Sequence, residues 1–474
     1  MQHPIVNLVE KLSGSEKRYI HLFLKTFTEK ENINLQDFAA IEKYAVNKNK
    51  PLKTRGNISR LYHKILDILA EYHQENLNNN NIDYINLNRA KLLFFKGFNS
   101  DAQKLVDKIL ASPSGNNHLI KVEAIELRLI HAVNSGEINY LASQFENDKL
   151  HLKNISEEYT NLINYEILWA ASKYETSSGY FFDNKSNFSE KQYQDYMTSE
   201  SNAISPMAKI LFNKLKGFES IKKHNPTEAL TFSERAVEIF HQNPGLILSS
   251  TVEYLKSLRN YAITLNFNKK PEIAYDYLNY IEKRIEKSIL NKNINVKIEN
   301  YVLFVMIRMD LMINGQHLFD LSPEFESFEK SYQEMRDLLP QDESIASSYH
   351  FVIYYLQSET PRKALKFINY ILKSPSTTRK DLHRLAMIAE LLVHFKIGNI
   401  DLLESKLNSY KKFLSKNLPV FGFETEIAPF FIKIINEPEN NNHFLQFNKT
   451  VDSVLTAEKK EIYKHYIPFH YFKK

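Results

Sequence analysis

The sequence contains no cysteine among its 474 residues, and glycine and proline are scarce, with 11 and 15 copies. The lack of cysteine excludes disulfides, thiolate metal sites, thiol nucleophiles and a lipid-bearing cysteine. So few turn-forming residues argue against an all-β fold and against glycine-rich phosphate loops. The sequence therefore favours a helical protein.

Long hydrophobic runs are also missing. The most apolar stretch, residues 301–313, contains Arg308 and Asp310, so it is too short and too charged to span a bilayer. The first residues, MQHPIVNLVEKLSGSEKRY, lack the basic-then-apolar pattern of a signal peptide. We expect a cytoplasmic protein with no membrane partner.

Familiar catalytic motifs are absent: there is no GxxxxGK[ST], GxSxG, GxGxxG or HExxH. One ExxH pair, Glu238 and His241, is more typical of an ordinary helix end than of a metal site, because a di-iron bundle needs a second pair and two more carboxylates. His465 and His470 are spaced too far apart to share a helical face. We expect no metal, no cofactor and no catalysis, although distant residues that assemble a site escape this kind of reading.

The stretch NPTEALTFSERAVEIF, residues 225–240, has the clearest helical pattern. Asn225 suits the N-cap, Pro226 suits the first helical position, and Glu228 is placed for a capping box. Apolar residues then follow at spacings of three and four: Ala229, Phe232, Ala236 and Phe240.

The same proline-led start recurs at Pro271, Pro323 and Pro361, at intervals of 45, 52 and 38 residues. Three of these four prolines are followed by alanine three residues later. Similar positions at Ala102 and Leu403 extend the pattern, with a mean interval of about 43 residues. A repeat of this kind predicts about eight helical pairs.

The spacing of small residues over residues 82–417 resembles that of the tetratricopeptide repeat family. Gly217, Ala229 and Ala236 match its three small positions, where paired helices cross closely, and the first two are matched again by Ala262 with Ala274 and by Ala90 with Ala102. The interval here is longer than in the family, and most aromatic positions are unmatched. The resemblance implies an α-solenoid that binds an extended peptide or a partner's helix on its concave side.

We therefore expect an all-α fold in three parts. Residues 1–75 form an N-terminal three-helix module, with helices at 16–27, 35–46 and 54–73. Residues 82–423 form the tetratricopeptide-like array. Within it, the polar residues 175–205 are interpreted as a degenerate repeat with a long loop. Residues 424–474 form a C-terminal helical cap, and polar residues 76–81 mark the first boundary.

The first hypothesis for function is a non-enzymatic scaffold or adaptor that binds protein or peptide. Matching the first helices by their small residues predicts the following side chains on the concave face: Lys91, Lys214, Lys256, Arg259, Asn266 and Tyr349. Their cationic bias favours an acidic or carboxylate-bearing segment. The alternative is that they are scattered surface residues.

The second hypothesis is a peptide-sensing regulator whose N-terminal module contacts nucleic acid. The net charge of +5 is small for this length, but residues 43–64 hold seven cations and no acidic residue. Arg55, Arg60 and Lys64 are the candidate phosphate contacts. The alternative is a solvated helix face in a lysine-rich protein, and exposure of these three residues would discriminate between the two.

Overall fold

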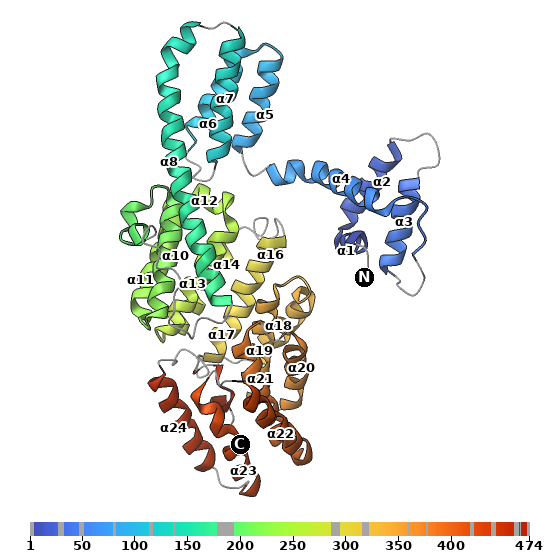
Figure 1. Ribbon diagram of the computed structural model, residues 1–474, viewed down its shortest axis with the longest axis vertical. Helices are drawn as coiled ribbons and strands as arrows, with labels where there is room; N and C mark the ends of the chain where they lie inside the picture. Colours follow the sequence, from blue (N-terminus) through green and yellow to red (C-terminus); the bar gives the residue numbers. More distant parts are fainter. Residues whose placement is uncertain are drawn as a thin grey trace. The chain divides into compact units, whose positions relative to one another are not determined.

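All regular secondary structure in the described residues of the computed structural model is helical (Figure 1). The structure describes the following residues: 4–26, 33–46, 52–78, 82–112, 117–135, 138–177, 194–285, 294–314, 322–358, 360–375, 378–417, 421–437, 442–458, 464 and 466–471. Within them, no helix is both long enough and apolar enough to cross a membrane. The all-α expectation is confirmed.

The chain divides into two compact units between Leu152 and Lys153. This division falls inside the long helix α8 (Ile138–Ser177). The segment expected as one array, 82–423, therefore contributes to both units.

The N-terminal module contains four helices rather than the expected three, namely α1 (Pro4–Lys11), α2 (Gly14–Thr26), α3 (Ile33–Val46) and α4 (Ile58–Asn78). Their core is separate from the rest of the chain, and α1 contributes Ile5, Val6 and Val9 to it. A helix of eight residues is marginal on its own and depends on such packing, which is why its pattern was missed. Residues 76–78, expected in a polar turn, are the last turn of α4.

The second part of the first unit holds α5 (Ile82–Phe95), α6 (Asn99–Leu110), α7 (His118–Ser135) and the start of α8. Ala90 and Ala102, two of the matched small residues, are fully buried between neighbouring helices. The buried Arg128 guanidinium on α7 pairs with Asp148 on α8 and, at 2.7 Å, with Asp107 on α6. One arginine thus links three helices.

The second unit contains fourteen α-helices in its described residues: the rest of α8 leads to α10 (Pro206–Lys222), α11 (Pro226–Gln242), α12 (Pro244–Ser249), α13 (Thr251–Phe267), α14 (Pro271–Arg284), α16 (Ile294–Tyr301), α17 (Ile307–Asn314), α18 (Ser322–Met335), α19 (Gln341–Gln357), α20 (Ala364–Lys373), α21 (Lys380–Lys396), α22 (Ile400–Lys416), α23 (Ile427–Asn436) and α24 (Asn442–Ala457). Helices close in sequence contact one another, as α10 does α11, and α19 does α20 and α21. One continuous hydrophobic core runs through them.

The region expected as a C-terminal cap, 424–474, shares this core. The Phe430 ring on α23 stacks on Phe447 of α24, with centroids 4.3 Å apart, and meets the edge of Phe469 at 5.3 Å. The hydroxyl of Tyr349 on α19 donates to the carbonyl of Tyr466 at 2.6 Å. These contacts join the last residues to the preceding helices.

The helix that begins at Pro226 follows the sequence pattern with one difference. The Asn225 side chain caps it, because its Oδ1 accepts the backbone N–H of Glu228 at 3.2 Å. The Glu228 carboxylate does not reach back to the Asn225 backbone N–H, which instead donates to the carbonyl of Ser220. The Glu228 carboxylate accepts a hydrogen bond from the Ser220 hydroxyl at 2.9 Å. It therefore joins α11 to α10 rather than completing a capping box.

Small side chains lie where α10 and α11 cross. A Cβ atom placed on Gly217 would lie 3.6 Å from both the carbonyl oxygen of Ala229 and the Cβ of Phe232. Ala229 is fully buried, and Ala236 nearly so. The two backbones are therefore so close that a methyl group on Gly217 would already be in van der Waals contact with α11. This agrees with the sequence prediction that small residues lie where paired helices cross.

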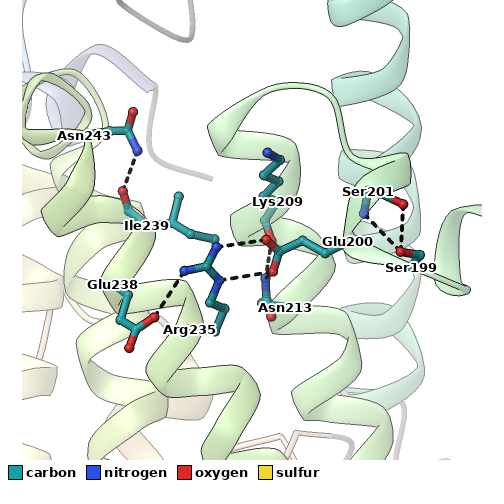
Figure 2. A network of polar contacts seen from close by, with 9 residues as sticks. All are labelled: Ser199, Glu200, Ser201, Lys209, Asn213, Arg235, Glu238, Ile239 and Asn243. Atoms are coloured by element: carbon teal, nitrogen blue, oxygen red, sulfur yellow. Dashed lines mark hydrogen bonds and ion pairs between the residues drawn. The ribbon is translucent and has the colours of Figure 1, made fainter.

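Part of the polar stretch 175–205 packs against this pair of helices. Residues 195–197 and 200–202 form single 3₁₀ turns. Figure 2 shows Glu200 between α10 and α11, where it accepts from Asn213 at 2.8 Å and from Arg235 at 3.1 Å. Burial alone would raise the pKa of Glu200, but these hydrogen bonds lower it. Residues 178–193 lie outside the described residues.

The Ala229→Leu variant tests the close crossing. Three extra carbon atoms have no space beside α10, and overpacking of this kind typically costs about 1–3 kcal/mol. We expect a lower free energy of unfolding in urea, whereas Thr231→Leu, two residues away on the exposed face of α11, should change it little. Equal stability of the two variants would contradict a tight crossing at Ala229.

Candidate functional site: an ion-pair cluster on α10, α13, α16 and α19

Helix α13 presents charged side chains to three other helices from one of its faces. Glu253, Lys256 and Arg259 follow one another at spacings of three residues, which keeps them on neighbouring positions of the helix surface. Together with Lys214 of α10, Glu299 of α16 and Glu343 of α19 they form what we call the ion-pair cluster.

Glu253 is held between two lysines. Its carboxylate lies 2.5 Å from Nζ of Lys214 and 3.0 Å from Nζ of Lys256. The Lys214 side chain is only 1% exposed, and its ammonium group also lies over the ring of Trp169, 4.7 Å from the centroid. Burial alone would raise the pKa of Glu253, but the two lysines outweigh it and lower the pKa to about 2.

Arg259 connects three helices. Its Nη1 lies 3.0 Å from the Glu343 carboxylate and 3.4 Å from Glu299. Burial disfavours the charge, yet the two carboxylates keep the pKa of Arg259 above its usual value. Helices that are well separated in sequence thus approach one another closely enough to share a single guanidinium group.

The cluster holds more negative than positive charge around its exposed edge. Burial raises the pKa of Glu299, whose Oε2 accepts no hydrogen bond from any described residue. On α8, burial and the nearby charge of Glu253 raise the pKa of Glu166. Asp342, which is exposed, adds its field to that of Glu343 at Arg259.

The outer atoms of the cluster are accessible. The side chains of Glu253, Lys256 and Glu343 are 28%, 30% and 23% exposed. They can therefore contact a partner without unfolding, whereas Lys214 and Arg259 cannot. The accessible part of the site is an edge of carboxylates with one lysine.

Three of the six residues expected on an exposed concave face are buried, and a fourth, Arg259, is only 11% exposed. Lys214 and Arg259 are enclosed in the cluster. Asn266 donates to Asp310 at 2.9 Å, and Tyr349 is bonded to Tyr466 as described above. The expectation of exposure was wrong for these residues because neighbouring helices pack directly on the positions they occupy.

The other two expected residues keep part of their exposure. Lys256 lies at the edge of the cluster, and Lys91, on α5 in the first unit, is exposed and paired with Glu123. A cationic surface is therefore not formed, since each of the lysines and arginines expected there faces a carboxylate. The expected preference for an acidic partner loses its physical basis.

The structure leaves two of the three basic candidates in the N-terminal module exposed. Arg55 and Arg60 are exposed, and Lys64 is half-buried. They lie in the loop before α4 and in its first two turns, on a module with its own core. They do not serve that core as buried ion pairs.

The residues of the ExxH motif have separate partners. Glu238 accepts from Arg235 at 3.2 Å (Figure 2), and the His241 imidazole contacts the Tyr254 hydroxyl at 3.2 Å. Burial lowers the pKa of His241. Over the described ranges, no group of three or more histidine and carboxylate side chains is placed to hold a metal ion. His465 and the side chain of His470 lie outside the described residues.

The acidic members of the cluster were missed by sequence reasoning. Glu253 and Glu343 lie in the first turns of α13 and α19, where a carboxylate usually needs no explanation beyond the helix dipole. Only the contacts of α13 with α10 and with α19 reveal that these carboxylates pair with the enclosed side chains of Lys214 and Arg259.

Comparisons of the chain with protein-family models, with curated proteins and with solved structures find no match. The resemblance to tetratricopeptide repeats therefore depends on this chain's own small residues.

The pKa of Glu253 predicts an acid-sensitive step in stability. The unfolded chain takes up this proton near pH 4.5, whereas the folded chain resists protonation until about pH 2. Stability from this group is thus complete above pH 5 and disappears as the pH falls toward 2, by about 3 kcal/mol in total.

Trp169, the only tryptophan, lies against Lys214 and reports on this part of the unit by fluorescence. Urea titrations at pH 6 and pH 3 measure the change. In the double variant Lys214→Met/Glu253→Gln, which removes both members of this ion pair, we expect a smaller decrease in stability between the two pH values. An unchanged pH dependence would show that Glu253 is not the responsible group.

Proposed function

We propose that this chain is a non-enzymatic scaffold that binds another protein or a peptide through the helices carrying the ion-pair cluster. The proposal adopts the α-solenoid interpretation, with about eight helical pairs, as its architecture. Buried small residues support that interpretation: Ala262 and Ala274, like Gly217 and Ala229, lie on consecutive contacting helices. Stacked pairs of this kind form extended binding surfaces.

The single observation that carries the proposal is the partly exposed carboxylate edge. Glu166 and Glu299 have raised pKa values, and burial is the first cause of each. A cation brought by a partner would contact the exposed Glu166, and its field would favour the ionised form of the more enclosed Glu299. The partner that suits this edge is therefore a segment with lysine or arginine, rather than the acidic segment expected from the sequence.

Structural roles compete with binding at this site. Lys214 and Arg259 stabilise the fold by pairing with partly buried carboxylates of neighbouring helices, so changing either would disturb helix packing as well as any binding. A test of binding must spare them. Glu166 and Asp342 are suitable because they are exposed and form no ion pair with a described residue.

The double variant Glu166→Gln/Asp342→Asn should weaken partner binding without unfolding the protein. Partners are first captured with the wild-type chain and then measured individually by calorimetry against both proteins. Removal of two screened charges at an interface edge is expected to reduce affinity about three- to tenfold at low salt, with the difference shrinking as salt rises.

The matched control removes the same charge from α22, as Asp401→Asn/Glu404→Gln, where both side chains are exposed. It should retain wild-type affinity. A partner that binds all three proteins equally would place the interface elsewhere, and turnover of a small molecule by the purified chain would defeat the scaffold proposal.

A further inference from the structure

The N-terminal module carries a group of cations that no described residue neutralises. These are Lys53 and Arg55 in the loop before α4, and Arg60 and Lys64 in its first two turns. None of the four forms an ion pair with a described residue. The cations of the ion-pair cluster in the second unit differ from these four, because each of them pairs with a carboxylate.

Backbone hydrogen bonds tie the loop that carries Arg55 to α3. The backbone N–H groups of Arg55 and Gly56 both donate to the carboxylate of Asp37, at 2.7 Å each. Asp37 is buried in α3, and a Cβ atom on Gly56 would lie 2.9 Å from its Oδ2. The close approach of the loop to α3 thus requires glycine at this position. Arg55 itself reaches Gln36 at 3.2 Å, so its guanidinium lies over the start of α3.

The first turns of α4 continue this basic surface. Asn57 caps the helix by accepting the N–H of Arg60 at 3.0 Å. Leu61 and Ile65 point into the core of the module, which leaves Arg60 and Lys64 on neighbouring outer positions, four residues apart. The nearest acidic residue along the chain, Asp67, lies beyond them and pairs with neither.

We propose that this loop and the first two turns of α4 bind the phosphate backbone of double-stranded DNA. Four cations held on a fixed loop and a helix, with no described carboxylate to compete for them, suit a row of phosphates. A single strand is less suitable, because it calls for exposed aromatic rings on which bases stack, and Tyr62 is half-buried against the module's core. Contacts to phosphates carry no sequence information, so the binding is independent of sequence.

The proposal does not depend on the function proposed for the second unit, since the module has its own core. In the regulator hypothesis, this loop and the first turns of α4 are the surface that contacts nucleic acid. Failure of either proposal would leave the other intact, because their variants lie in different units and their probes differ.

The test measures binding of the full chain to a fluorescein-labelled 30-base-pair duplex of mixed sequence by anisotropy, from 50 to 300 mM NaCl. The variant Arg55→Gln/Arg60→Gln/Lys64→Gln should bind about tenfold or more weakly at 100 mM salt. The slope of log K against log[salt] should become shallower by about one for each phosphate that the variant no longer neutralises. A helical circular dichroism spectrum equal to that of the wild-type chain is the control that the variant is folded.

The matched control removes three exposed lysines from α22, as Lys411→Gln/Lys412→Gln/Lys416→Gln. It lowers the net charge equally and should leave both affinity and slope unchanged. Equal weakening by the two triple variants would overturn the proposal, since only net charge would then matter. The absence of duplex binding at 50 mM salt, or binding to anionic phosphatidylglycerol vesicles in its place, would overturn it as well.

Discussion

The close approach of paired helices at small side chains is the constraint on which the rest of the second unit depends. Gly217 and Ala229 allow the backbones of α10 and α11 to come within one alanine-sized contact. Large side chains then fill the remaining space, as the stacked Phe351 and Phe367 rings do between α19 and α20. Because interiors are densely packed, small residues at the crossings and large residues between them complement one another.

The ion-pair cluster is a consequence of that packing. When α13, α16 and α19 meet at Arg259, polar side chains that would line an open groove become partly or wholly buried. A buried charge is tolerated only with a partner, and Glu253, Glu299 and Glu343 supply the partners. The same arrangement leaves an acidic excess at the accessible edge. The enclosed side chains of Lys214 and Arg259 stabilise the contacts between helices, whereas the recognition that we propose would use the accessible carboxylates.

The N-terminal module distributes its charges differently. Its one well-buried carboxylate near the basic loop, Asp37, is occupied by backbone N–H groups and so does not neutralise the arginines beside it. The cations of this loop and of α4 remain available to an external anion. A chain of small net charge can thus carry a basic surface and an acidic edge on separate hydrophobic cores.

The sequence by itself determined the all-α fold and the starts of several helices, although it did not indicate α1. Helical periodicity, Asn225 as a cap and Pro226 and Pro271 at helix starts are local signals, and small residues at fixed offsets mark crossings that the structure shows as buried. It also located the basic loop, because residues 43–64 hold seven cations and no acidic residue that could pair with them locally. Only the tertiary structure decided which polar residues remain accessible. Lys214, Arg259, Asn266 and Tyr349 looked like surface residues, and their burial depends on Glu253, Glu343, Asp310 and Tyr466, from 39 to 117 residues away. No local pattern encodes such contacts, since they arise from how successive helices stack.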